Sequence, residues 1–522
     1  MKAPSSNQTY DCIVVGSGAS GSIVAAKLSE AGQSVLILEA GPSRELKDLV
    51  SSQMWARQLK WSGSPVEEEG NLKIGHAFNA GFGAGGSALH HYGVWPRLHS
   101  NDFDIWSRYG RSLDWPISYE TLRPYYDEVQ ADVGISGDAK AEIWRPKGDP
   151  YPMPPLPIFA QGQVISKGFT AMGLTTAPIP LAINSVPYKG NPSCIYDGWC
   201  DAGCPTGALK NPLVTHLKQA ILAGAEIRYD AQVTRVLTDK TRQKMASGVE
   251  YIDRDGQRQM VKAGKVVVAA FTVQTVRILL NSVDANGVAL GNQFDNLGRY
   301  LTTHGGRNVF GLFPDQTDPY LGATGGQLIC QDHYDDKTAI EGSFGSYQWL
   351  IANAVKPNGL LGYANSRPDI FGLKLQPFME RAAKHLGNML YVGEDPSVRE
   401  NRVVLSDKMD KFGIPIARAI HNAGPEQDVQ MAFAMEEGEA IFRAAGATDV
   451  WTGPPAPIHI MGGAVMGSDE KTSVTDDLGL VHGTGNLYVV GPSVFPTSGA
   501  VNPTFTVSAL AYRTAEYLSK LS

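Results

Sequence analysis

Three glycines near the start of the chain have the spacing of a nucleotide-binding loop. They form the pattern G-x-G-x-x-G at Gly16, Gly18 and Gly21, and Glu39 follows 18 positions after the last of them. The first glycine permits a tight turn, the second lets the backbone approach a pyrophosphate, and the third lets a helix pack closely on a strand. The carboxylate of Glu39 can accept hydrogen bonds from ribose hydroxyls and would repel the 2′-phosphate of NADP. These residues alone leave FAD and NAD open.

The segments around the glycines must position this chemistry. Residues 11–15 form a short run rich in β-branched residues, which predicts a buried parallel strand. Residues 23–31 have the apolar periodicity of a helix, and residues 34–38 predict a second strand that ends at Glu39. This order places a pyrophosphate at a helix N-terminus, where free N–H groups and the helix dipole favour an anion. A nucleotide site is therefore preferred over a tight turn that binds nothing.

Three of the five cysteines lie within eleven residues, at Cys194, Cys200 and Cys204. Zinc normally takes four ligands, so a zinc site would also need His216. Thiolates followed by proline in a glycine-rich loop also bind iron–sulfur clusters, and three cysteines suit a 3Fe–4S cluster. A disulfide between two of the three and free thiols that stabilise a loop are the alternatives. The spacing leaves all of these open.

Composition restricts the class of protein. The 522 residues are 43% hydrophobic and 19% charged, which supplies enough apolar surface for a large core and excludes a mainly disordered chain. The net charge is −7 and no basic run is present, so nucleic acid is not an expected partner. No stretch approaches the roughly 18 apolar residues of a membrane-spanning helix. We expect about three domain-sized units, or two large ones.

Further motifs extend over most of the chain. A second glycine-rich loop, NAGFGAGGSALHH, begins at Asn79, and LGRYLTTH spans residues 297–304. HIMGGAVMG begins at His459, and residues 486–518 combine a strand-like run, a Gly/Pro-rich turn and a helix. In order and spacing these segments resemble the glucose–methanol–choline (GMC) family of FAD oxidoreductases. The closest likeness is to the catalytic subunits of bacterial sugar and polyol dehydrogenases and to pyranose-oxidising members.

The resemblance implies an α/β fold with two kinds of domain. A Rossmann-like FAD-binding domain is expected to comprise three segments, residues 1–155, 205–305 and 455–522. A connecting loop with the cysteines covers 156–204. An α+β substrate-binding domain, with an antiparallel sheet that covers the flavin, covers 306–454.

The sequence also makes local predictions. Helical patterns lie near residues 376–386 and 427–445. The stretch 140–180 is rich in proline and poorly periodic, so it is predicted to be extended. Phe271 departs from the family pattern, which has a small, glycine-like residue at this position.

The resemblance implies His459 and Asn502, 43 residues apart, as a catalytic pair. Oxidation of a CH–OH group removes the hydroxyl proton while hydride leaves the carbon for flavin N5. Histidine, with an ordinary pKa of about 6.5, suits the role of base, and the Asn502 amide can bond the oxygen as it becomes carbonyl-like. A buried structural histidine and an Asn-Pro turn are the alternative. His304 is expected to hold local structure rather than to do chemistry.

Ten residues are expected to bind the flavin: Gly16, Gly18, Gly21, Glu39, Gly85, Gly86, Ser87, His90, His91 and Pro503. His90 stands four residues after Gly86, where some sugar-oxidising relatives bond FAD covalently. The residues around His90 differ from that pattern. A position lining the flavin or substrate pocket is therefore preferred for His90 and His91 over a covalent bond.

The expected function is FAD-dependent oxidation of a CH–OH group in a sugar, glycoside or polyol, with electrons passed to an acceptor other than NAD. The likeness of the cysteine loop adds a 3Fe–4S cluster, a small subunit and a cytochrome acceptor to these expectations. An oxidase that converts O2 to H2O2 is one alternative, and a flavin-dependent lyase is another. A flavin-binding subunit without activity is disfavoured, because His459 and Asn502 are both present.

The polar N-terminus, residues 1–10, lacks the features of a secretory signal. From its own sequence the chain is therefore expected in the cytoplasm. Relatives with the cysteine loop are exported folded beside a partner that bears a signal, so a periplasmic location by such co-export is the alternative.

Overall fold

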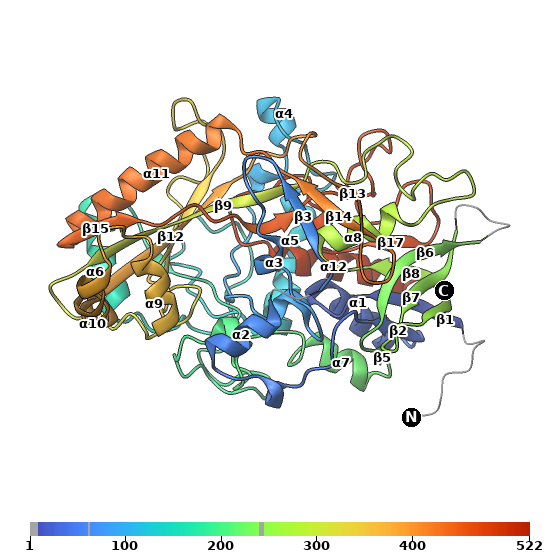
Figure 1. Cartoon of the computed structure of the whole chain (residues 1–522), viewed down its shortest axis with the longest axis horizontal. Coiled ribbons are helices and arrows are strands. Elements are labelled where there is room, and N and C mark those ends of the chain that lie inside the picture. Colours follow the sequence, from blue (N-terminus) through green and yellow to red (C-terminus); the bar gives the residue numbers. More distant parts are fainter. Residues whose placement is uncertain (1–8, 61–62, 240–244, 522) are drawn as a thin grey trace.

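Two large sheets and one small sheet organise the computed structural model, which describes residues 9–60, 63–239 and 245–521 (Figure 1). Most of the N-terminal segment considered as a secretory signal, residues 1–8, lies outside these ranges. Within the described ranges, no helix has both the length and the apolar character needed to cross a bilayer.

The first large sheet is mainly parallel and carries the N-terminal glycine-rich loop. Its strands are β1 (Thr9–Val15), β2 (Val35–Leu38), β5 (Glu226–Arg228), β6 (Gln232–Thr238), β7 (Ala246–Ile252), β8 (Arg258–Val268) and β17 (Leu487–Val489). They are arranged in the order β5-β2-β1-β8-β7-β6, with β17 paired to β8. Only β7 runs in the direction opposite to the other strands of this sheet. β2 and β17 are buried along their whole length, as expected for parallel strands covered on both faces.

Helices from distant parts of the sequence pack beside this sheet. α1 (Ala19–Glu30) follows β1 and contacts both α7 (His216–Leu222) and α12 (Thr504–Ser519), and α12 in turn contacts α5 (Tyr119–Val129). The β1–α1–β2 unit confirms the predicted strand–loop–helix–strand order and the Rossmann-like α/β fold. The C-terminal strand–turn–helix, β17 to α12, returns to the same sheet.

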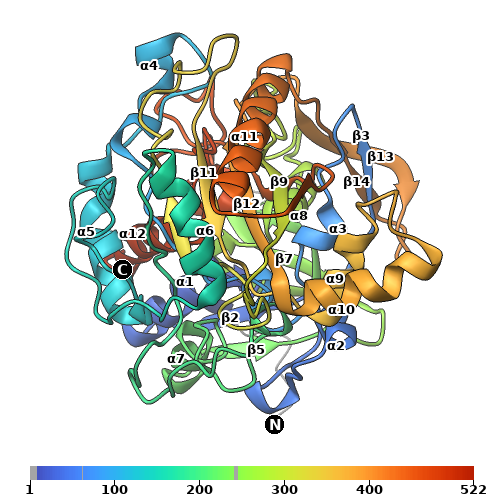
Figure 2. The same ribbon diagram turned by 90° about the vertical axis from the view of Figure 1, so that its left-hand side faces the viewer.

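The second large sheet is antiparallel throughout. Its strands are β4 (Ala177–Pro178), β9 (Thr302–Leu312), β10 (Leu328–Cys330), β11 (Tyr347–Ile351), β12 (Leu386–Glu394), β15 (Asp449–Thr452) and β16 (Ile458–Met461). They run in the order β15-β9-β12-β11-β10-β4, with β16 paired to β9. α11 (Pro425–Ala444) and α6 (Ala160–Ala171) lie across this sheet, as Figure 2 shows. The predicted antiparallel sheet is confirmed, and the two predicted helices are α10 (Leu375–His385) and α11.

A small third sheet lies beside the first. It consists of β3 (Val66–Glu69), β13 (Arg402–Met409) and β14 (Pro415–Ile420), and β14 runs parallel to β3. Arg277 of α8 (Thr272–Leu280) donates to the Pro415 carbonyl at 2.7 Å and pairs with Asp410 at 2.8 Å. Residues 402–420, which the sequence placed in the substrate-binding domain, therefore pack on the helix that follows β8. The remaining helices are α2 (Gln53–Leu59), α3 (His76–Asn79), α4 (Ile105–Tyr109) and α9 (Pro357–Ala364).

The stretch 140–180 is not extended throughout, because α6 lies within it. Ile165 and Phe169, four positions apart and fully buried, form its apolar face. A Cβ at Gly168 would lie 2.1 Å from the Ile441 carbonyl oxygen, so α11 approaches α6 closely only because that side chain is absent. The prediction of an extended segment is wrong for α6, whose short apolar periodicity follows directly after the proline-rich part.

A buried lysine joins the parts of the chain that carry the two large sheets. Lys337 Nζ pairs with Asp102 at 2.8 Å and with Glu394 at 2.7 Å, and it donates to Ser346 Oγ at 3.0 Å. Burial alone would lower the pKa of Lys337, but the two carboxylates outweigh burial and raise this pKa above its ordinary value. Asp102 belongs to the N-terminal part and Glu394 ends β12, so one ammonium group holds both parts.

Replacing Lys337 by methionine should destabilise the protein strongly. Two buried carboxylates would lose their counter-charge, and breaking a buried pair in this way costs about 3–5 kcal/mol. Denaturant unfolding measures the loss. Lys408→Met is the matched control, because the Lys408–Glu67 pair at 2.6 Å lies at the surface, where such pairs contribute little. Equal losses in the two variants would contradict this role of Lys337.

Candidate active site

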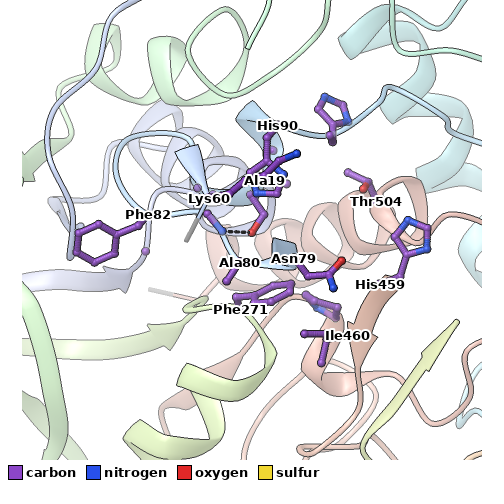
Figure 3. Close-up of a pocket in the computed structure, with 18 of the residues that line it drawn as sticks. Ala19, Lys60, Asn79, Ala80, Phe82, His90, Phe271, His459, Ile460 and Thr504 are labelled. Atoms are coloured by element: carbon purple, nitrogen blue, oxygen red, sulfur yellow. Dashed lines mark hydrogen bonds between the residues drawn. The ribbon is translucent and has the colours of Figure 1, made fainter. Parts of the chain in front are cut away.

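A cavity of about 470 Å³ lies where the two glycine-rich loops meet β16 and the start of α12 (Figure 3). Its size falls within the range of small-molecule and cofactor sites. The predicted residues that line it include Gly16, Gly18, Glu39, Gly86, Ser87, His90, His91, His459, Asn502 and Pro503. Segments more than 400 residues apart in the sequence thus meet around one space.

The N-terminal glycines leave space in two different ways. A Cβ at Gly16 would lie 2.6 Å from the Ala269 carbonyl oxygen, and a Cβ at Gly21 would lie 2.2 Å from the Gly16 carbonyl oxygen. These two glycines let the chain itself pack closely. At Gly18 the nearest atom, the Gly85 carbonyl oxygen, is 4.0 Å away. The space at Gly18 is therefore open toward the cavity, at the N-terminus of α1, where an anion is favoured.

Glu39 is buried and already has four protein donors. One carboxylate oxygen accepts from the backbone N–H of Ser17 at 3.0 Å and from its hydroxyl at 2.7 Å. The other accepts from Gly41 N–H at 3.0 Å and Gly83 N–H at 3.1 Å. Burial raises the pKa of Glu39 in spite of these bonds. Four donors match the roughly four lone-pair positions of a carboxylate, so any ligand hydroxyl that bonded Glu39 would replace one of them, and the rotatable Ser17 hydroxyl is suited to yield.

The second glycine-rich loop lies against the first. Gly85 and Gly86 have left-handed φ angles of +86° and +54°, and a Cβ at Gly86 would lie 3.2 Å from the Gly18 Cα. Ser87 Oγ accepts a bond from Gly81 N–H at 2.8 Å, so its hydroxyl closes the loop. The loop therefore presents backbone rather than bulky side chains next to the open space at Gly18.

His90 and His91 differ in their contacts. His91 donates from Nε2 to the Lys210 carbonyl at 2.8 Å. His90 is buried, and its Nε2 has no hydrogen-bond partner among the described residues. Burial lowers the pKa of His90 to about 3 and that of His91 to about 4, so both rings are neutral. An unsatisfied buried nitrogen costs about 1–3 kcal/mol, which favours a bound ligand that supplies the missing partner of His90.

Phe271 has a strained backbone at the cavity wall. Its φ of 60° and ψ of 173° lie in a region occupied almost only by glycine. Figure 3 shows its ring beside Asn79 and Ile460. The departure from the family pattern thus places an aromatic ring in the site at the cost of local strain, a contribution that the sequence did not reveal.

His459 and Asn502 lie together at the cavity wall. Asn502 Nδ2 is 3.2 Å from His459 Nε2, and Figure 3 shows the His459 ring near Thr504. On the other side of the ring, His459 Nδ1 is 2.9 Å from His304 Nδ1. Burial, reinforced by His304, lowers the pKa of His459 well below its ordinary value, and burial lowers the pKa of His304 to about 4. Both imidazoles are therefore neutral near pH 7.

The contacts determine where each proton lies. His304 Nε2 is 3.2 Å from the Ser498 carbonyl oxygen, which can only accept, so His304 carries its proton on Nε2. Its Nδ1 is then a lone pair, and His459 must donate to it from Nδ1. This leaves a lone pair on His459 Nε2, the nitrogen next to Asn502. His304, which the sequence assigned to local structure, thereby sets the tautomer of His459.

The cysteine loop does not support a metal site. Cys194, Cys200 and Cys204 lie in one apolar cluster, and burial raises the pKa of Cys194 to about 11 and that of Cys200 to about 12. His216, the fourth ligand that zinc would need, bonds the Tyr512 hydroxyl at 2.7 Å. In the described part of the chain no three His, Cys, Asp or Glu side chains are placed to hold a metal ion. All three cysteines are free thiols, with no disulfide between them.

Comparison with known proteins decides the family. A family model described as GMC oxidoreductase matches residues 10–305, and a second model with the same description matches residues 397–511. The chain belongs to the GMC oxidoreductase family. The predicted family and enzyme class are thereby confirmed. The roles predicted for the individual site residues stay predictions.

Several relatives match this GMC oxidoreductase over nearly its whole length. It is 33% identical to 2-methyl-1,2-propanediol dehydrogenase of Mycolicibacterium austroafricanum, over 99% of this chain and 96% of the relative. It is 29% identical to the fructose dehydrogenase large subunit of Gluconobacter japonicus, over 98% of each. A crystal structure of pyridoxine 4-oxidase from Mesorbium loti has the same fold, with a TM-score of 0.65 and 18% identity over 98% of this chain and 99% of that one.

Adding a methyl group at Gly18 should reduce flavin binding without preventing folding. The Gly18→Ala side chain meets no protein atom closer than 4.0 Å but fills space that faces the cavity. We expect a circular dichroism spectrum like that of the wild type and a lower visible flavin absorbance per mole of protein. Gly362→Ala in α9 is the control, because no atom lies within 4 Å of its Cβ and Gly362 does not line the cavity. Unchanged flavin content in Gly18→Ala would contradict the placement.

Proposed function

We propose that this GMC oxidoreductase binds FAD in the cavity and oxidises a CH–OH group of a sugar, glycoside or polyol, with His459 Nε2 as the base. The observation that carries the proposal is the neutral His459, whose Nε2 lone pair is fixed by His304 on the wall of a cavity built from two glycine-rich loops. A structure concerned with FAD modification in formate oxidase of Aspergillus oryzae, which has a TM-score of 0.67 and 16% identity to this chain, supports the choice of cofactor.

Three groups of residues would hold the cofactor. The N-terminus of α1 at Gly18 would receive the pyrophosphate, and Glu39 would bind ribose. His90, with its unpartnered Nε2, would bond a polar edge of the flavin. When bound, FAD supplies the acceptor for the hydride that leaves the substrate carbon.

His459 and Asn502 would act on different atoms of the substrate hydroxyl group, His459 on the proton and Asn502 on the oxygen. The lone pair of His459 Nε2 takes the hydroxyl proton, and the ring can then hold the positive charge because its Nδ1–H remains bonded to His304. The Asn502 amide N–H stabilises the oxygen as negative charge develops on it. Both groups are fixed before the substrate arrives, which limits the reorganisation that the reaction requires.

The antiparallel sheet supports a polyhydroxylated substrate. Three polar side chains from this part line the cavity, namely Asn308, Thr324 and Asn353. Asn353 Oδ1 is buried without a hydrogen-bond partner among the described residues. A substrate with several hydroxyl groups can donate to this oxygen, whereas a simple apolar alcohol cannot. The names of the propanediol and fructose dehydrogenases agree with this class.

We further propose that electrons leave to an acceptor other than O2 or NAD. The two relatives named above are called dehydrogenases, and the fructose enzyme is named as the large subunit of an assembly. A 26% identical relative is the gluconate 2-dehydrogenase flavoprotein of Pantoea cypripedii. Measurement of dye reduction against H2O2 release separates this function from an oxidase. Reduction of the flavin by a polyol without air separates it from a lyase.

Substitution of His459 by alanine should slow flavin reduction by about 10²–10⁴-fold, the usual contribution of a positioned base. Because His459 is not among the residues expected to anchor FAD, the variant should keep its yellow colour. Anaerobic stopped-flow mixing with a series of sugars and polyols measures the rate. His385→Ala, at the end of α10, is the control. A wild-type rate in His459→Ala would remove this residue from the mechanism.

The pH dependence of flavin reduction tests the state of the base. Burial lowers the pKa of His459 well below 6.5, so the ring stays unprotonated, and able to act as a base, as the pH falls through 6.5. The reduction rate should therefore be level between about pH 6 and 8 and should fall only at lower pH. An acid limb centred at or above pH 6.5 would contradict this protonation state.

A further inference from the structure

A chain of hydrogen bonds leads from Asn502 away from the cavity. Asn502 Oδ1 accepts from Gln348 Nε2 at 3.2 Å, and Gln348 Oε1 accepts from Gln331 Nε2 at 2.9 Å. Gln331 Oε1 is 3.3 Å from His99 Nε2, and His99 Nδ1 is 2.9 Å from Asp335 Oδ1. Three carboxamides in a row thus connect the proposed catalytic pair to an imidazole and a carboxylate.

The chain runs from the buried site to the surface. Gln348 lies in β11 and Gln331 follows β10, the strand paired with it, and both side chains are buried. His99 is also buried, whereas the Asp335 side chain is 76% exposed. Because each buried amide bonds the next one, the direction of one amide fixes the direction of all three.

The contacts give the direction of each amide. Gln348 Nε2 donates to Asn502, Gln331 Nε2 donates to Gln348, and the Gln331 carbonyl oxygen faces His99 Nε2. The Asp335 carboxylate can only accept, so His99 Nδ1 donates to it, and this bond lowers the pKa of Asp335. Every carbonyl in the row faces His99 and every NH2 group faces the cavity.

Two further contacts hold His99 in place. Its backbone N–H donates to the Asp102 carboxylate at 2.8 Å, and its ring stacks on Tyr334 at 3.9 Å between centroids.

The opposite direction would deprive the substrate oxygen of its donor. If the row were reversed, Asn502 would present its carbonyl oxygen to His459 Nε2. That oxygen would face the lone pair that His304 fixes on His459 Nε2, and no N–H of Asn502 would remain to stabilise the substrate oxygen. The polarity of the row therefore matters as much as its presence, and aligned hydrogen bonds of this kind reinforce one another.

We propose that His99, Gln331 and Gln348 are positioning residues that turn the NH2 group of Asn502 toward His459 Nε2 and the substrate oxygen. The inference rests on the proposed role of His459 as the base. The two glutamines hold the Asn502 amide in this direction, and His99 with Asp335 holds the far end of the row. None of the three residues contacts the substrate position itself.

Two substitutions at one position test the proposal. Gln348→Met keeps the side-chain volume and breaks the row, so Asn502 loses its fixed direction, and kcat should fall about 10-fold or more with little change in KM. The effect of Gln348→Glu on kcat depends on whether the introduced carboxyl group is neutral or ionised. As a neutral acid it has one donor and one acceptor, like glutamine, and restores the row. As a carboxylate it only accepts, turns the NH2 group of Asn502 away from His459, and should lower kcat about 10²–10³-fold.

The ratio of kcat in Gln348→Glu to kcat in Gln348→Met should therefore be above one at low pH and should fall below one as the introduced carboxyl ionises. A ratio that stays at or below one at low pH, or that does not fall as the pH rises, would overturn the proposal. Gln430→Met is the control for loss of a buried glutamine outside the row, because Gln430 bonds the Tyr391 hydroxyl and the Gly345 carbonyl instead. Its kcat should stay near that of the wild type.

A measurement without substrate separates this inference from the proposed function. Nitrogen-15 spectra of histidine-labelled holoenzyme report which nitrogen of His459 is protonated, with His459→Ala used to assign the signal. We expect the proton on Nδ1 in the wild type and in both variants, because His304 fixes it, and a shifted signal of the unprotonated Nε2 in ionised Gln348→Glu, where the Asn502 NH2 group no longer donates to it. If this shift appears but no polyol reduces the flavin, the proposed function fails alone. If the Nε2 signal is the same in the wild type and in Gln348→Glu, the positioning role fails.

Discussion

The contact between two imidazole rings sets the chemistry of this site. His304 donates its Nε2 proton to the Ser498 backbone carbonyl, so its Nδ1 must accept from His459. This backbone contact therefore decides, through two rings, that His459 presents a lone pair on Nε2. Burial keeps both rings neutral by penalising their charged forms. Without this contact the buried His459 could adopt either tautomer, and only one of them is a base toward the cavity.

The fold supplies this contact by bringing three segments to one place. β9 carries His304 and β16 carries His459, and these strands pair in the antiparallel sheet, whereas Asn502 precedes α12 beside the parallel sheet. His459 itself has a left-handed φ of 60°, an uncommon conformation for a residue other than glycine. Strain of this kind persists where the surrounding structure holds the conformation. Here His304 and Asn502 contact the two nitrogens of the His459 ring.

Local patterns predicted local structure well. The β1–α1–β2 unit, the antiparallel sheet and helices α10 and α11 follow from periodicity, glycine spacing and family likeness. The same patterns could not reveal that Glu39 has four protein donors, because Gly83 lies 44 residues away in the sequence. Nor could they reveal His304 beside His459, 155 positions apart, or the glutamines behind Asn502, since an isolated His or Gln in a strand has no distinctive signature. The α6 helix escaped prediction because its two glycines are poor helix formers, and the close packing of Gly168 against α11 cannot be read from the local sequence.

The buried ammonium of Lys337 has a second effect, through Tyr334. The Tyr334 hydroxyl donates to Asp102 at 2.9 Å and accepts from Ala500 N–H at 3.0 Å, two residues before Asn502. The buried charges that join the parts carrying the two large sheets therefore also hold the segment that leads to Asn502. A change that separated these parts would also displace the Asn502 amide, so the same charges support both the stability of the fold and the geometry of the site.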